Sequence, residues 1–201
     1  MTSLSCSPSA LAARLLAGEA AIFPTDTLPA LASRPEAANL LWELKQRPRH
    51  KPVILMAGTT NALLHCLGRP IEPAWQNMAE RYWPGALTLV LPAQGPWLEQ
   101  LNPGGATLGL RLPACPAALE LLALSGPLAT TSANRSGEPA CLDHQEAAAR
   151  FPQVAQLGPV PWPAPSGQGS TVIEWLPEGG WKLLRAGAVM PPELSTHGTS
   201  A

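Results

Sequence analysis

The sequence has few charged residues, few aromatic residues and only four cysteines. Charged residues make up 13% of the 201 residues and the formal net charge is −1, so bulk charge does not indicate a nucleic-acid scaffold. The cysteines form no C-x-x-C pair and no zinc-ligand spacing with a histidine pair. The N-terminus lacks a basic start followed by an apolar run, and no segment approaches the roughly 18 apolar residues of a membrane span. These absences predict a reduced, cytoplasmic protein with no membrane segment.

Several common catalytic motifs are also missing. Neither G-x-x-x-x-G-K-[ST] nor G-x-G-x-x-G occurs, so the two common nucleotide loops are absent. There is no G-x-S-x-G elbow and no HExxH, and the four histidines have no evident Ser or Cys partner in the sequence. The sequence therefore favours a reaction driven by positioning and charge stabilisation over covalent catalysis.

The residues that are present predict a globular α/β fold. Hydrophobic residues make up 46% of the chain, and apolar runs of strand length alternate with helical patterns. That interleaving favours a sheet covered by helices over an all-β barrel. We expect one domain over 1–190 and a fraying polar tail at 191–201. The expected strands are 20–23, 53–56, 86–91, 107–112, 128–131, 170–175 and 181–185, and the Pro- and Gly-rich segments 92–105 and 158–169 are expected to be loops.

Polar side chains follow or interrupt four of the apolar strands. They are Thr25-Asp26-Thr27, Arg111, Ser132 with Asn134, and Ser170-Thr171. In open α/β sheets ligands collect at strand ends, and arginine offers a rigid fork for carboxylate or phosphate. These residue types suit a site for a polyanion together with a small zwitterion.

Each candidate also has a structural interpretation. Lys45 and Arg47 lie at a predicted helix C-terminus, where cations interact with the helix dipole. Arg111 interrupts an apolar strand, and a buried charge needs either an internal ion pair or a ligand. Ser132 and Asn134 are also ordinary turn residues, and Asp26 is either a Mg²⁺ ligand or a turn cap. Spacing alone leaves these alternatives open.

Seven ordered blocks resemble the YrdC/Sua5 family of threonylcarbamoyl-AMP synthases over about residues 9–190. The blocks are Phe23-Pro-Thr-Asp-Thr27; Lys45-Gln-Arg-Pro48 with Pro52-Val-Ile-Leu-Met56; Trp83-Pro-Gly-Ala-Leu-Thr-Leu-Val90; Gly109-Leu-Arg-Leu-Pro113; Thr131-Ser-Ala-Asn134 with Ser136-Gly-Glu-Pro139; Gly169-Ser-Thr171; and Leu184-Arg-Ala-Gly187. The resemblance implies a twisted, mostly mixed open sheet with helices on its faces and a large, concave, locally positive cavity.

The resemblance also implies a reaction. ATP, L-threonine and bicarbonate would bind in the cavity, with Mg²⁺ accompanying ATP, and give threonylcarbamoyl-AMP and pyrophosphate. Such an enzyme is a nucleotidyltransferase, and its product would pass to a separate transferase that modifies an adenosine beside the anticodon of certain tRNAs.

The resemblance assigns roles residue by residue. Lys45 and Arg47 look like the phosphate-binding pair of the family, with Ser132, Asn134 and Arg185 as further ATP contacts. The residues that look like threonine contacts are Thr27, Arg111 and Ser170.

One segment departs from the pattern of the family. Leu28-Pro29-Ala30 stands where the family usually has Val-Tyr-Gly. This change keeps two alternatives open: a nucleotide-binding paralogue without this synthesis, and a module that uses the same cavity for double-stranded RNA or tRNA.

Overall fold

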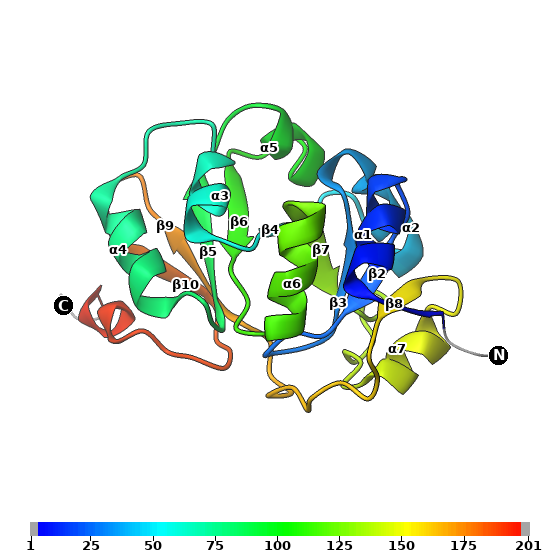
Figure 1. Ribbon diagram of the computed structural model, residues 1–201. Helices are drawn as coiled ribbons and strands as arrows, with labels where there is room; N and C mark the ends of the chain where they lie inside the picture. The colour runs from blue at the N-terminus through cyan, green and yellow to red at the C-terminus, as the bar shows by residue number, and fades with distance from the viewer. Residues whose placement is uncertain (1–3, 198–201) are drawn as a thin grey trace.

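In the computed structural model of the protein, which describes residues 4–197, strands and helices alternate along most of the chain (Figure 1). The strands of this range are β1 (Ser5–Cys6), β2 (Ala21–Phe23), β3 (Ala30–Ser33), β4 (Ile54–Met56), β5 (Leu87–Pro92), β6 (Thr107–Arg111), β7 (Leu128–Ser132), β8 (Ala155–Leu157), β9 (Thr171–Trp175) and β10 (Trp181–Arg185). The helices are α1 (Pro8–Leu16), α2 (Asn39–Lys45), α3 (Thr60–His65), α4 (Pro73–Tyr82), α5 (Pro96–Leu101), α6 (Pro116–Ser125) and α7 (His144–Arg150), with short 3₁₀ helices η1 (Pro35–Ala37) and η2 (Pro192–His197).

All of these strands belong to one mixed sheet, in the order β1-β8-β2-β3-β7-β4-β6-β5-β9-β10. Pairs such as β2–β3, β3–β7 and β5–β6 are antiparallel, whereas β4–β6 and β5–β9 are parallel. The sheet is open, because β1 and β10 lie at its two ends. The prediction of an α/β fold with an open, mixed sheet is therefore confirmed.

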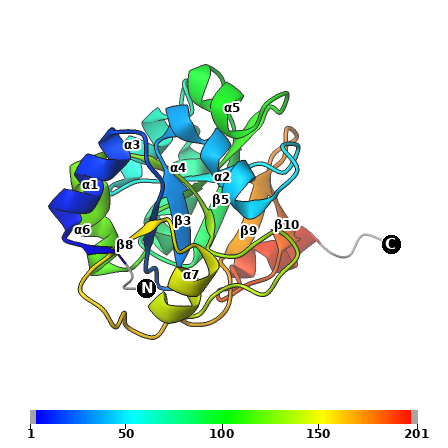
Figure 2. The same ribbon diagram turned by 90° about the vertical axis from the view of Figure 1, so that its right-hand side faces the viewer.

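Both faces of the sheet are covered by helices. Figure 2 shows α1 and α6 on one side of β3 and β8, and α2 on the other. Ala147 of α7 belongs to the same core as Trp42 of α2. The side chains of β2 divide between these layers, since successive strand residues point to opposite faces. Ile22 belongs to the core with Trp42 of α2, whereas Phe23 belongs to the core with Leu11 of α1 and Leu121 of α6. Each such side chain contributes about 1.5–3 kcal/mol when fully buried.

Three short strands and one helix were missed by the sequence analysis. The segment predicted as a loop at 92–105 contains α5, so that prediction was wrong in part. Gly95 precedes α5 with φ +90°, and Pro96 occupies the first turn, where its missing N–H costs nothing. The missed strands β1, β3 and β8 contain two to four residues each, too few for a clear period-2 pattern.

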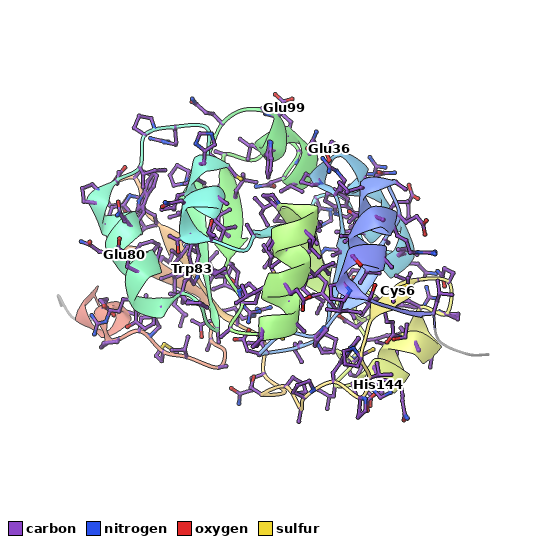
Figure 3. The ribbon with its side chains drawn as sticks, in the orientation of Figure 1. Cys6, Glu36, Glu80, Trp83, Glu99 and His144 are labelled. Carbon is purple, nitrogen blue, oxygen red and sulfur yellow. The ribbon has the colours of Figure 1, made fainter. Side chains whose placement is uncertain are left out.

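The segment that contains Glu193 contacts the end of α4. Of the predicted tail 191–201, residues 198–201 lie outside the described part, and Pro192–His197 form η2. The Glu193 carboxylate accepts hydrogen bonds from Arg81 and from the Tyr82 hydroxyl. Trp83, which directly follows α4 (Figure 3), donates its indole N–H to the Leu87 carbonyl at 2.7 Å. No helix within residues 4–197 combines the length and apolar character needed to cross a membrane.

Candidate functional site

A cavity of about 200 Å³ gathers residues from neighbouring strands of the sheet. Its walls come from the turn between β2 and β3, from β4 to β7 and from the segment around β9 and β10. Six of the eight predicted site residues line it: Thr27, Arg47, Arg111, Ser132, Ser170 and Arg185. The other two, Lys45 and Asn134, are not among its lining residues.

Arg111 is held rigidly at the end of β6. Its side chain is only 4% exposed, and its guanidinium donates to the Asp26 carboxylate at 2.6 Å. Two further donors reach the Thr27 hydroxyl at 2.6 Å and the Gly85 carbonyl at 3.1 Å. Three of the five guanidinium N–H groups are therefore used, and two remain for a ligand. Arg111 therefore forms an internal ion pair with Asp26 and also lines the cavity.

The hydroxyl of Thr27 is held by Arg111, whose Nη1 donates to the Thr27 oxygen at 2.6 Å. The neighbouring Thr25 hydroxyl, 3.1 Å away, donates its own proton to the Leu28 carbonyl at 2.7 Å. Its oxygen accepts from the backbone N–H groups of Thr27 and Leu28 at 3.1 and 3.2 Å, which uses both of its lone pairs. Thr27 therefore keeps a proton and a lone pair that it can offer to a ligand in the cavity.

Arg185 and Ser170 form a second polar wall. Arg185 Nη2 donates to the Ser170 carbonyl at 2.7 Å, and its Nε donates to the same oxygen at 3.3 Å. The Ser170 hydroxyl lies 2.8 Å from the hydroxyl of Thr88, which is fully buried in β5 and also lines the cavity. Sequence analysis missed Thr88, although it is the only polar residue of the expected strand 86–91.

Arg47 reaches the cavity because the chain turns sharply after α2. Gln46 adopts the left-handed conformation with φ +51°, which ends the helix, and the Arg47 N–H bonds back to the Trp42 carbonyl. The Arg47 guanidinium donates to the carbonyls of Lys51 at 3.3 Å and Pro52 at 3.0 Å. These acceptors belong to the following loop, so the side chain is not capping α2.

Lys45 points the other way, into the protein. Its side chain is buried, and Nζ donates to the carbonyls of Ser132 and Asn134 and to Asn134 Oδ1. Burial, with a smaller contribution from the charge of Arg47, lowers the pKa of Lys45 to about 8. Lys45 and Asn134 thus lie beside Ser132, one layer behind the cavity wall.

The cavity carries an excess of positive charge. Arg47, Arg111 and Arg185 line it, and among the described residues only Arg111 has a carboxylate partner, Asp26. Burial lowers the pKa of all three arginines, and at Arg111 the charge of Asp26 opposes that lowering. Arginine nevertheless stays protonated in proteins. A locally cationic cavity in a chain of net charge −1 is suited to an anionic ligand.

In the part of the chain that the structure describes, metal-ligating side chains do not gather at this cavity. Within residues 4–197, no group of three or more His, Cys, Asp or Glu side chains is placed to hold a metal ion. Asp26, the predicted candidate, accepts from Arg111 and from the Ala114 N–H through the same oxygen, Oδ1.

The fold and the cavity define a class of α/β proteins with an open mixed sheet and a cavity lined by arginines and hydroxyls. A family model for Sua5, YciO and YrdC proteins, described as "Telomere recombination", matches residues 13–187. The chain therefore belongs to the Sua5/YciO/YrdC family, as its sequence blocks predicted.

Named relatives and solved structures agree with this assignment. The threonylcarbamoyl-AMP synthase of Bacillus subtilis is 38% identical over 133 residues, which cover 64% of this chain and 38% of that protein. A putative threonylcarbamoyl-AMP synthase of Mycobacterium tuberculosis H37Rv is 32% identical over 177 residues, 86% of this chain and 80% of that one. The structure of P. abyssi Sua5 complexed with L-threonine matches with a TM-score of 0.82 and 32% identity, over 90% of this chain and 54% of that chain. The match thus spans well under two thirds of the Bacillus subtilis protein and of the P. abyssi Sua5 chain.

Proposed function

We propose that this protein is an L-threonylcarbamoyladenylate synthase, a nucleotidyltransferase that forms threonylcarbamoyl-AMP and pyrophosphate from L-threonine, bicarbonate and ATP. The observation that carries the proposal is the convergence of three arginines and several hydroxyls on one cavity, while among the described residues only Arg111 of these arginines pairs with a carboxylate, that of Asp26. Relatives with this name and a threonine-bound neighbour support it. The product would serve the threonylcarbamoyl modification of tRNA in the cytoplasm through a separate transferase.

The chemistry proposed for the cavity needs no protein nucleophile. The threonine amine attacks the carbon of bicarbonate, a C–N bond forms, the C–OH bond breaks, and the hydroxyl leaves as water with one proton from the amine. By the equivalent route, bicarbonate first loses hydroxide, and the amine then adds to the carbon dioxide so formed and gives one proton to that hydroxide. The resulting N-carboxylate attacks the α-phosphorus of ATP, and the bond from that phosphorus to the β-phosphate bridging oxygen breaks to release pyrophosphate. Negative charge develops on the departing oxygen, so fixed cations beside it lower the barrier.

The orientation of each polar group suggests how threonine would bind. The two spare N–H groups of Arg111 suit the substrate carboxylate, since guanidinium binds carboxylates in a bidentate manner. A lone pair of the Thr27 hydroxyl suits the substrate ammonium group, which can only donate. Ser170, beside Thr88, would complete this end of the cavity. Arg47, Arg185 and Ser132 are left for the nucleotide.

Mg²⁺ would enter with ATP. Mg²⁺ in nucleotide sites is typically held by phosphates, waters and one or two carboxylates, and it would neutralise phosphate charge there. That mode of binding fits a cavity whose described side chains offer no cluster of metal ligands.

The decisive assay is pyrophosphate release from ATP, with threonine and bicarbonate omitted in turn. We expect release to require both. Arg47→Ala should lower turnover about 100-fold, the usual effect of removing one transition-state donor. The matched control is Arg49→Ala, since Arg49 is an exposed cation two residues away and outside the cavity lining.

The possible outcomes separate the competing functions. Pyrophosphate release that does not depend on threonine would refute the proposal. Salt-sensitive tRNA binding without turnover would indicate the RNA-binding module. Nucleotide binding without turnover would indicate a paralogue in which Pro29 and Ala30, both in the cavity lining, have changed the chemistry.

A further inference from the structure

The ammonium group of Lys45 is fully used inside the protein. The residue is 1% exposed, and Nζ lies 2.6 Å from the Ser132 carbonyl, 2.5 Å from the Asn134 carbonyl and 3.1 Å from Asn134 Oδ1. An ammonium has three N–H donors, and these three acceptors satisfy all of them. Contact between Lys45 and a phosphate would require at least one of these buried bonds to break.

The side-chain amide of Asn134 has only one chemically consistent orientation. Its Nδ2 faces the carbonyls of Arg135 at 2.9 Å and Glu138 at 2.7 Å, so this atom must be the donor. Its Oδ1 faces the ammonium of Lys45 and the hydroxyl of Ser132. Lys45 and these two carbonyls therefore fix the amide and hold Oδ1 against Ser132.

This arrangement determines the direction of the Ser132 hydroxyl. Oδ1 is an acceptor only, so at 2.6 Å the Ser132 Oγ must donate its single proton to Asn134. Ser132 lines the cavity, whereas Lys45 and Asn134 do not. With its proton directed away, Ser132 presents lone pairs to the cavity. The oxygens of an ionised phosphate have no proton to donate to these lone pairs, whereas an N–H or O–H group of a nucleoside has one.

We propose that Lys45 and Asn134 are positioning residues, which hold Ser132 as a hydrogen-bond acceptor for the nucleoside part of the nucleotide, and that Lys45 does not contact phosphate. The adenine amino group or a ribose hydroxyl supplies the donor. Arg47, which does line the cavity, is the cation of this segment that contacts phosphate. This inference rests on the nucleotide site of the proposed function.

The main chain supports the same role for Lys45. Its carbonyl accepts from the Ser136 N–H at 2.9 Å, so both the backbone and the side chain of Lys45 bond to the segment 132–136. The Ala133 N–H in turn bonds to the Pro29 carbonyl at 2.8 Å, which seats this segment beside the cavity wall. Lys45 thus connects the end of α2 to the end of β7, where Ser132 lies, and to the loop that follows.

The test compares binding of adenosine and AMP to the full chain, measured by NMR titration and calorimetry. Ser132→Ala and Lys45→Met should each weaken both ligands by the same factor, roughly 5-fold, as expected for one lost hydrogen bond. The double variant should be little weaker than either single variant, because both changes remove the same interaction. Arg47→Gln is the matched control and should weaken AMP while leaving adenosine unchanged.

The outcomes distinguish this inference from the proposed function. The positioning role would be overturned if Lys45→Met weakened the binding of AMP but not that of adenosine, or if the losses of affinity multiplied in the double variant. Either result would leave the nucleotide site intact. Wild-type protein that binds neither ligand would overturn both. If urea unfolding shows that Lys45→Met does not fold, Asn134→Ala provides the comparison instead, since it removes the acceptor of the Ser132 proton directly. Equal losses for both ligands are expected there too.

Discussion

The buried ion pair between Asp26 and Arg111 offers the sharpest test of how the cavity is held together. Asp26→Ala removes the oxygen that accepts from Arg111 Nη2 at 2.6 Å and from the Ala114 N–H at 3.0 Å. The Arg111 side chain is 4% exposed, so its charge would stay buried without a counter-ion. Breaking a buried pair in this way costs about 3–5 kcal/mol.

The assay is urea unfolding, with an exposed ion pair as the control. Glu36, labelled at the periphery in Figure 3, pairs with Arg34, and their side chains are 56% and 35% exposed. Glu36→Ala should therefore cost about 1 kcal/mol or less. Asp26→Asn keeps an acceptor and removes the charge, so we expect an intermediate loss of roughly 2 kcal/mol. Equal losses for Asp26→Ala and Glu36→Ala would refute the reasoning.

The same substitution has a functional consequence. Once Asp26 is removed, Arg111 keeps its bonds to Thr27 and Gly85 but loses the partner that fixes its second terminal nitrogen. Under the proposed function, the KM for threonine should rise more than the KM for ATP. A KM change confined to ATP would show that the carboxylate end of the cavity has been assigned wrongly.

Two further predictions concern the backbone and pH. Gly187→Ala should destabilise the protein by about 1–3 kcal/mol and lower activity, because the new Cβ would meet the Gly169 carbonyl oxygen and, at 2.5 Å, the Ser170 carbonyl carbon. The control is Gly58→Ala, whose Cβ would come no closer than 3.6 Å to the surrounding atoms and should change stability by less than about 0.5 kcal/mol. Equal urea-unfolding midpoints for the two variants would refute the clash at Gly187. The pKa of Lys45 is about 8 in the folded protein against 10.5 when unperturbed, so the unfolded chain holds this proton more tightly. The contribution of this group to the free energy of unfolding should therefore rise by roughly 2 kcal/mol between pH 8 and pH 10. Urea unfolding of the wild type and of Lys45→Met should show a difference in the free energy of unfolding that changes with pH. A difference that stays constant over this range would contradict the prediction.

Much of the architecture could be predicted from local patterns. The strands expected at 170–175 and 181–185 were confirmed, and they pair as the antiparallel strands β9 and β10, because two apolar runs flank a turn rich in Gly and Pro. The strand β3 was missed because Ala30–Ser33 is short and follows Pro29 directly, and it gains its pairing from β2 and β7. Short strands of this kind depend on partners that a local pattern does not reveal.

The sequence by itself determined the family and predicted six of the residues that line the cavity. Its ordered blocks placed Thr27, Arg111 and Ser170 together before any contact was known, and all three line one cavity. Hydroxyls and arginines at strand ends carry this information, because strand ends meet at a shared edge.

Only the tertiary structure decided how the paired cations divide their roles. Lys45 and Arg47 stand two residues apart, yet the left-handed turn at Gln46 sends one side chain inward and the other to the cavity. The acceptors of Lys45 lie 87 and 89 residues further along the chain. A buried charge must find partners wherever the fold supplies them, so its role follows from packing and not from its place in a motif.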